Sequence, residues 1–256
     1  TGVPSGFTEL DKLTNGWQKS DLVIVAARPG MGKTAFCLAL AKNAAVDYNR
    51  PVAFFSLEMS ALQLTHRLMS MVAEIPGSKL RNAQMEDYEW QQLNSAVERF
   101  SEVPIFIDDT PAINIFELRA KCRRLKMHHD IQLVIVDYLQ LMSAGPEGKR
   151  GGTREQEIST ISRALKTMAK ELEVPVIALS QLSRAVETRG GNKRPQLSDL
   201  RDSGAIEQDA DIVMFLYRDG YYNKDKVEDV NLAECIVAKN RHGETGTVNL
   251  RWNGQY

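Results

Sequence analysis

The chain has 256 residues, a length that fits one large domain or at most two small ones. Hydrophobic residues make up 43% of the chain and charged residues 25%, so it can bury a sizeable core and is not disordered as a whole. The net charge of −1 excludes a histone-like protein and a polybasic membrane binder, although a local positive surface could still bind nucleic acid.

The sequence shows no sign of a membrane or secreted protein. No apolar run approaches the roughly 20 residues of a membrane span, and the N-terminus (TGVPSGF) lacks the layout of a signal peptide. The cysteines Cys37, Cys122 and Cys235 are odd in number and scattered, which argues against a disulfide framework or a zinc site. We therefore expect a cytoplasmic protein with no membrane partner, in which each cysteine is a small buried residue.

Short apolar runs alternate with longer helical patterns along the chain. Strands are predicted at Leu22–Ala26, Val52–Leu57, Ile105–Ile107, Leu133–Val136, Val176–Leu179 and Ile212–Leu216. Helices are predicted at 33–47, 60–74, 86–101, 114–128 and 154–172, and the second of them begins with a capping box because Gln63 follows Ser60 by three residues. This alternation predicts an α/β fold with a mainly parallel central sheet flanked by helices.

The C-terminal part of the chain has a different pattern. Two strands, Ala233–Ala238 and Gly246–Trp252, are predicted to form an antiparallel hairpin around a turn at Arg241–Glu244. Two stretches rich in glycine and basic residues, 143–153 and 187–195, follow predicted strands. We expect both to be loops at the edge of the sheet where open α/β folds place their binding sites.

A phosphate-binding loop is predicted between the first strand and the first helix. Residues 27–34 (ARPGMGKT) match G-x-x-x-x-G-K-[ST], with Ala27 in place of the first glycine. In such a loop, backbone N–H groups and the helix dipole face the phosphates, Lys33 supplies charge to the β- and γ-phosphates, and Thr34 binds Mg²⁺. The ATP-binding residues predicted from this motif are Arg28, Pro29, Gly30, Met31, Gly32, Lys33, Thr34 and Ala35.

Other predicted strands end in polar residues. Asp137 ends one strand and is predicted to bind Mg²⁺ together with Thr34. Many P-loop ATPases place a water-activating glutamate directly after this aspartate, but Tyr138 stands there, so Glu58 at another strand end is the predicted general base. Gln181 ends a further strand, where an amide can contact the γ-phosphate. Taken alone, Asp137 would fit a turn or a helix cap, Glu58 an acidic residue near a helix N-terminus, and Gln181 an ordinary surface residue.

Several segments resemble the C-terminal motor domain of the bacterial replicative DNA helicase, the DnaB family, which has a RecA-like fold. The resembling segments are residues 27–34, 56–60 (SLEMS), 136–141 (VDYLQL), 178–184 (ALSQLSR), 199–211 (DLRDSGAIEQDAD), 238–243 (AKNRHG) and 246–247. The family's N-terminal primase-binding domain and linker helix have no counterpart here. We therefore expect a single RecA-like ATPase domain over residues 1–256, belonging to a longer protein that binds primase and a helicase loader.

The resemblance implies a role for each predicted residue. Glu58 resembles the catalytic base, Asp137 the metal carboxylate and Gln181 the γ-phosphate sensor of the family. Lys239 and Arg241 match a pair of cations that such motors insert into the ATP site of the neighbouring subunit, where added positive charge stabilises the transition state. The resemblance also implies a homo-hexameric ring with ATP between its subunits.

Contact with single-stranded DNA is a second implication. In the family, the stretch that corresponds to residues 201–204 faces the channel of the ring, and residues 181–201 of this chain hold five basic and two acidic residues. Contacts to phosphates hold any sequence, as a translocating motor requires. The predicted DNA-binding residues are Arg184, Lys193, Arg194, Arg201, Asp202 and Gly204.

The sequence therefore predicts an ATP-driven, ring-shaped replicative DNA helicase. A RecA/RadA-type recombinase or a related RecA-fold ATPase shares the phosphate loop and the sheet, but the segment 199–211 and the pair Lys239 and Arg241 favour the helicase. A P-loop kinase of small molecules would need an acceptor site, and no such group of residues is evident. A non-catalytic ATP-dependent scaffold is disfavoured because Glu58, Gln181 and Arg241 are all present.

Overall fold

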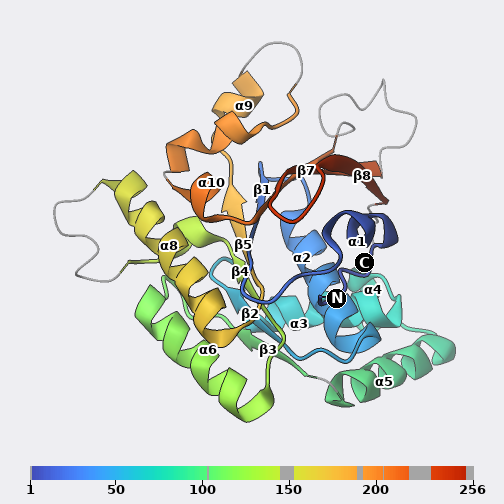
Figure 1. Ribbon diagram of the computed structural model, residues 1–256. Coiled ribbons are helices and arrows are strands. Elements are labelled where there is room, and N and C mark those ends of the chain that lie inside the picture. The colour runs from blue at the N-terminus through green and yellow to red at the C-terminus, as the bar shows by residue number, and fades with distance from the viewer. Residues whose placement is uncertain are drawn as a thin grey trace.

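The computed structural model describes residues 2–102, 104–144, 153–188, 193–203, 205–218 and 232–251 (Figure 1). Within these residues, eight strands form one sheet in the order β3-β2-β4-β5-β1-β6-β7-β8. The strands are β1 (Leu22–Ala27), β2 (Val52–Ser56), β3 (Ile105–Asp108), β4 (Leu133–Asp137), β5 (Val176–Gln181), β6 (Ile212–Tyr217), β7 (Leu232–Asn240) and β8 (Gly246–Arg251).

The sheet is parallel from β3 to β6 and becomes antiparallel at β7 and β8. Every residue of β2, β4 and β6 is buried, whereas the edge strand β3 is half-buried throughout. Strands covered on both faces can be apolar at each position, since neither face meets water. The predicted parallel sheet and the C-terminal hairpin are both confirmed.

Helices cover the two faces of this sheet (Figure 1). The helices are α1 (Thr8–Thr14), α2 (Lys33–Lys42), α3 (Ala61–Ala73), α4 (Gly77–Asn82), α5 (Asp87–Glu102), α6 (Ile115–His129), α8 (Arg154–Leu172), α9 (Ala185–Thr188) and α10 (Ile206–Asp209). Successive residues of β1 enter opposite apolar clusters: Val23 packs with α2 and α3, and Ile24 packs with α6 and α8. This alternation follows from the two-residue period of a strand.

The five predicted helices and all the predicted strands are present; the first helix apart, their ends differ by two residues at most, and the predicted strand end at Trp252 lies outside the described residues. The predicted helix 33–47 changes at Asn43 into a π-helical turn that ends at Asp47. The capping box at α3 is confirmed, because Ser60 Oγ accepts from Gln63 N and Gln63 Oε1 accepts from Ser60 N. The short helices α1, α4, α9 and α10 were not predicted, since pieces of four to seven residues show little periodicity.

Three smaller expectations can be compared with the structure. All three cysteines are buried and unpaired, as predicted. The predicted loop 187–195 was wrong at its start: Glu187 is helical in α9, and its Oε1 lies 3.2 Å from Arg28 Nε. The rest of that loop at 189–192, and residues 145–152 of the other predicted loop, lie outside the described residues. Among the described helices, none combines the length and the apolarity that crossing a membrane requires.

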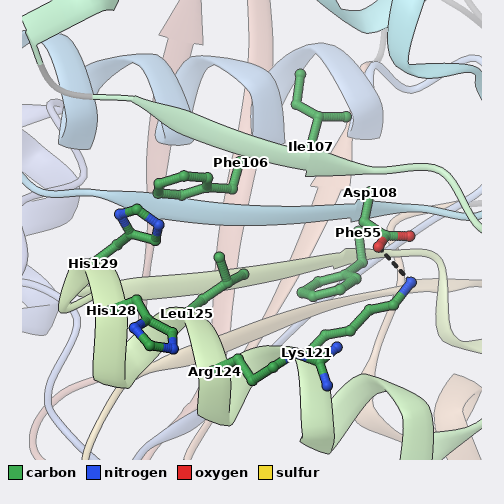
Figure 2. A pocket seen from close by; sticks show the side chains of 9 residues that line it. All are labelled: Phe55, Phe106, Ile107, Asp108, Lys121, Arg124, Leu125, His128 and His129. Atoms are coloured by element: carbon green, nitrogen blue, oxygen red, sulfur yellow. Dashed lines mark hydrogen bonds and ion pairs between the residues drawn. The ribbon is translucent and has the colours of Figure 1, made fainter.

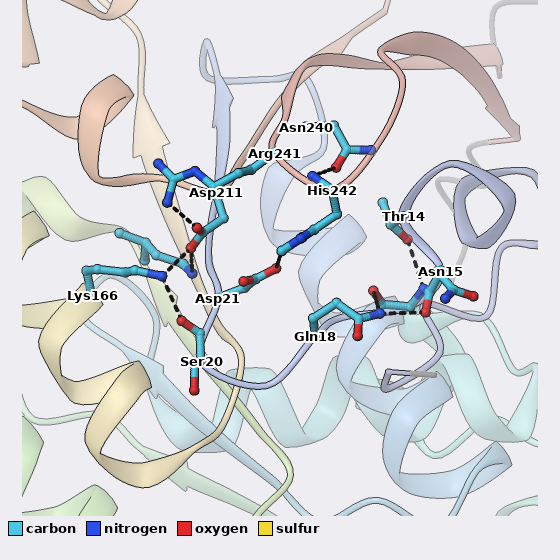
Figure 3. Close-up of polar contacts among 12 residues, drawn as sticks. Thr14, Asn15, Gln18, Ser20, Asp21, Lys166, Asp211, Asn240, Arg241 and His242 are labelled. Carbon is cyan, nitrogen blue, oxygen red and sulfur yellow. Dashed lines mark hydrogen bonds and ion pairs between the residues drawn. The ribbon is translucent and has the colours of Figure 1, made fainter.

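A buried carboxylate, Asp211, joins four elements at the edge of the sheet where β1 and β6 begin (Figure 3). Its Oδ2 accepts from Leu22 N of β1 at 2.9 Å and from Lys166 Nζ of α8 at 2.6 Å. Its Oδ1 lies 2.5 Å from Arg241 Nη1, in the turn between β7 and β8. Because Asp211 directly precedes β6, one side chain fixes two strands, a helix and the hairpin turn.

A second polar contact supports the same turn. His242 Nε2 lies 2.7 Å from Oδ2 of Asp21, which directly precedes β1 (Figure 3). Burial raises the pKa of Asp21 and the nearby Asp211 charge raises it further, while His242 and Lys166 oppose both effects. Arg241 and His242 are therefore attached to the edge where the parallel strands begin.

Replacing Asp211 with alanine should destabilise the fold. The substitution leaves the half-buried Lys166 ammonium without its carboxylate, and breaking a buried pair in this way costs about 3–5 kcal/mol. Urea unfolding followed by circular dichroism measures this loss. Glu9→Ala is the control, because the exposed Glu9–Lys12 pair should contribute less than about 1 kcal/mol. Equal effects of the two substitutions would contradict the anchoring role of Asp211.

Candidate nucleotide site

The loop between β1 and α2 forms an anion-binding helix N-terminus. Gly30 and Gly32 have φ angles of 86° and 83°, in the left-handed region that favours glycine. Gly32 caps α2, and no side chain occupies its cap position. The first N–H groups of α2 therefore have no acceptor within their helix, and together with the helix dipole they attract a negative ligand.

Lys33, at the start of α2, lies between two carboxylates. Its Nζ is 3.4 Å from Glu58 Oε2 and 3.5 Å from Asp137 Oδ1, and it stands 3.9 Å from the centre of the Tyr138 ring. Lys33 is only 6% exposed and Asp137 is fully buried, whereas the side chain of Glu58 is 49% exposed. Glu58 is thus the member of the group that solvent water reaches most easily.

The strand register explains why these residues meet. Ser56 at the end of β2 pairs with Asp137 at the end of β4, and Ala27 at the end of β1 pairs with Gln181 at the end of β5. The carboxyl ends of these parallel strands share one edge of the sheet. The chain leaves the neighbouring strands β1 and β5 toward opposite sides, so the strand order reverses between them. Open α/β folds bind their ligands at such a point, at the carboxyl ends of the strands.

Asp137 and Thr34 offer oxygen atoms to a cation. Thr34 Oγ1 donates to Asp137 Oδ2 at 2.9 Å. The pKa of Asp137 is raised, chiefly by burial and also by the Glu58 charge. The Lys33 ammonium and the hydrogen bond from Thr34 oppose this rise. Two carboxylates face one ammonium, so the group has an excess of negative charge. Carboxylate and hydroxyl oxygens with such an excess fit Mg²⁺, a hard cation that prefers oxygen ligands.

A short turn after β2 fixes the backbone of Glu58. Ser56 Oγ donates to Met59 O at 2.8 Å and accepts from Met59 N at 3.1 Å, so one hydroxyl binds both backbone groups of Met59 and closes the turn that contains Glu58. Leu57 N donates to the main-chain oxygen of Asp137 at 2.9 Å. The carboxylate of Glu58 therefore projects from a fixed backbone toward Lys33.

Gln140 is a residue of this site to which the sequence analysis gave no role. Its Oε1 accepts from Gln181 N at 3.1 Å, and its Nε2 donates to Ser180 Oγ at 2.8 Å. It thereby connects the segment after Asp137 to the end of β5. Within the described residues the amide of Gln181 itself makes no side-chain hydrogen bond. The only signal for Gln140 was its place in the quoted segment 136–141.

Two arginines contact the loops around the site. Arg28 Nη1 donates to Leu182 O at 2.6 Å, which connects the phosphate loop to the segment after β5. Arg218, directly after β6, donates from Nη1 to Gly30 O at 2.9 Å. The sequence analysis missed Arg218, since no motif marks a single arginine behind a strand.

Lys239 and Arg241 do not join the group of Lys33. They lie at the opposite edge of the sheet, because β7 is antiparallel to β6 and places Asn240 beside Ile212, at the start of β6. The six residues of β1 separate that edge from the phosphate loop by about 17 Å. Lys239 Nζ donates to Glu207 O at 2.6 Å, and burial together with the nearby Arg241 charge lowers the pKa of Lys239.

The predicted DNA-binding residues follow β5. Arg184 is exposed, and Lys193 and Arg194 are half-buried. Arg194 forms an ion pair with Glu234 of β7, with Nε 2.8 Å from Oε2. The backbone of Arg201 and Asp202 belongs to a 3₁₀ helix (Leu197–Ser203), and Gly204 lies outside the described residues.

Known proteins resemble the whole chain. The sequence model of the DnaB-like helicase C-terminal domain matches residues 2–256. The replicative DNA helicase DnaB of Geobacillus stearothermophilus is 54% identical over all of this chain, and the replicative DNA helicase DnaC of Bacillus subtilis is 52% identical. The chain spans 56% of the length of each of these two relatives.

Solved structures give the same result for the fold. A DnaB-like replicative helicase, solved in a study of its interactions with primase, has a TM-score of 0.92 and 46% identity, and the match covers 100% of this chain and 62% of that one. A separately solved ATPase domain also has a TM-score of 0.92, with 45% identity over 100% of this chain and 89% of its own. The fold is therefore RecA-like, and the chain belongs to the family of DnaB-like helicase C-terminal domains.

Proposed function

We propose that residues 1–256 form a single RecA-like motor domain that hydrolyses ATP in a DNA helicase. The observation that carries this proposal is the meeting of Lys33, Thr34, Glu58 and Asp137 beside a glycine-rich helix N-terminus. That group provides the parts that phosphoryl transfer to water needs: an anion cradle, a cation, metal ligands and a base. The helicase names of the relatives support the same conclusion.

Each residue has a defined task in the proposed reaction. The N–H groups at the start of α2 hold the phosphates, and Lys33 contacts the β- and γ-phosphates. Thr34 and Asp137 hold Mg²⁺, which neutralises phosphate charge when bound. Glu58, the most exposed carboxylate of the group, accepts a proton from the water that attacks the γ-phosphate in line. Gln181 contacts the γ-phosphate with its amide.

The position of Lys239 and Arg241 supports a site shared between subunits. These cations lie at the far edge of the sheet from the phosphate loop of their own chain, so they can act only on the nucleotide of another. Arg241 is suited to this task, because its side chain is 47% exposed and Asp211 keeps Lys166 and Leu22 N as partners without it. A closed ring, a homo-hexamer in this proposal, gives every subunit such a neighbour.

Single-stranded DNA is the proposed track of this motor. Arg184 and Lys193 follow β5, whose end carries Gln181, so the proposed γ-phosphate contact and the proposed DNA contacts belong to one stretch of the chain. Arg194, Arg201, Asp202 and Gly204 complete the proposed contacts with the DNA backbone. Primase and a helicase loader are the proposed partners of the longer protein, and a solved relative was studied for its interactions with primase.

Glu58→Gln should abolish ATP hydrolysis while leaving ATP binding intact. Loss of the general base lowers the rate by about 10²–10⁴-fold, and the amide keeps the size of the side chain. Phosphate release measures the rate, and a fluorescent ATP analogue measures binding. Glu98→Gln is the matched control, since Glu98 is an exposed residue of α5 remote from the site. Full activity of Glu58→Gln would refute its role as the base.

Mixing two inactive variants tests the shared site. Arg241→Ala subunits keep Glu58, and Glu58→Gln subunits keep Arg241, so about a quarter of the interfaces in randomly mixed rings regain both residues. DNA-stimulated ATP hydrolysis of the mixture should exceed that of either parent. A mixture as inactive as its parents would exclude action between subunits. Lys239→Ala replaces Arg241→Ala if thermal melting shows that loss of the Asp211 contact unfolds the chain.

A further inference from the structure

The edge strand β3 has features of a peptide-binding site. It is the terminal strand of the sheet and pairs with β2 on one side. No strand in the described part of the chain pairs with its other side. An unpaired strand edge presents a row of backbone N–H and C=O groups that an extended segment can join.

Pockets lie on both faces of the sheet beside this strand. The larger one, of about 420 Å³, lies between β3 and α6 and is lined by Phe55, Phe106 and Leu125, with Arg124 and His128 at its rim (Figure 2). The smaller one, of about 160 Å³, lies toward α3 and α5 and is apolar. Its lining residues include Leu68, Met69, Phe100 and Ile105. Since side chains of an added strand alternate between faces, successive residues would enter the two pockets.

The charge around the larger pocket is positive. Of the five Lys and Arg residues of helix α6, only Lys121 and Arg124 line the pocket, and the others form ion pairs with Glu171 or Asp130. The one carboxylate that lines the pocket, Asp108, is neutralised by Lys121 Nζ at 2.6 Å (Figure 2). Burial alone would raise the pKa of Asp108, but hydrogen bonds from Lys121 and Thr110 outweigh it, so the carboxyl stays ionised and paired. Arg124 is exposed and forms no ion pair within the described residues. An acidic ligand is therefore favoured.

We infer that β3 accepts an extended, acidic segment of another protein as an additional strand. Carboxylates of that segment face Arg124 and α6, and its alternate apolar side chains enter the pocket beside Phe100 and Ile105. The four-residue length of β3 and the preceding Pro104 limit the number of backbone hydrogen bonds. The complex is consequently short-lived, and the two pockets, not the backbone, decide which segment binds.

The probe for this surface is a fluorescent peptide that alternates valine with glutamate. Fluorescence anisotropy with the full chain should show saturable binding, weakened by about tenfold when lysine replaces glutamate. Methylating alternate backbone nitrogens of the peptide should also weaken binding by about tenfold, because strand pairing needs those N–H groups. Hydrogen exchange should show protection of the amides of residues 105–108 on binding.

Two exposed arginines on α6 provide a matched pair of variants. Arg124→Glu should weaken binding of the glutamate peptide by about tenfold, whereas Arg123→Glu, which changes a residue outside the pocket, should weaken it by less than about twofold. Equal losses in the two variants, equal binding of the lysine peptide, or unchanged exchange at residues 105–108 would each overturn the inference. Absence of saturable binding up to about 1 mM peptide would overturn it as well.

Discussion

The need to neutralise a buried carboxylate determines the arrangement of the site. Asp137 is fully enclosed, and an isolated ionised carboxylate is too costly to bury. Lys33 and Thr34 meet this requirement from the start of α2, and they can do so only if the β1–α2 loop lies at the same edge as the end of β4. The strand order and register bring the β1–α2 loop and the end of β4 to the same edge of the sheet. The phosphate loop, the proposed metal ligands and the proposed base are thus held together by the contacts that offset the burial of Asp137.

The two ends of the parallel strands carry chemically different groups. The carboxyl ends of the parallel strands carry the phosphate loop with Glu58 and Gln181, and the opposite edge carries the Asp211 network with Arg241. Antiparallel β7 is the reason for this division, because it returns the chain to the edge where β1 began. If β7 ran parallel to β6, Arg241 would lie at the same end of the strands as the phosphate loop.

Local patterns in the sequence were sufficient to predict most of the fold and four of the residues that meet at the candidate site. The phosphate loop is contiguous, so Lys33 and Thr34 could be assigned from spacing alone, and Glu58 and Asp137 followed from the ends of apolar runs. Gln140 and Arg218 depend on partners 41 and 188 residues away in sequence, and no local pattern encodes such contacts. Arg241 was predicted as a catalytic cation, but its resting contact with Asp211 required the antiparallel register of β7.

The location of Arg241 across the sheet from its own phosphate loop also bears on how a ring could open. In the proposed arrangement every contact is head-to-tail and joins two unlike surfaces. Breaking one contact exposes two different subunit surfaces. One carries a phosphate loop without its neighbouring turn, and the other carries an Arg241 turn without its neighbouring phosphate loop. A DNA strand that enters through such a gap passes between a surface suited to anions and the turn that carries Arg241, so the two sides of the gap differ for whatever loads it.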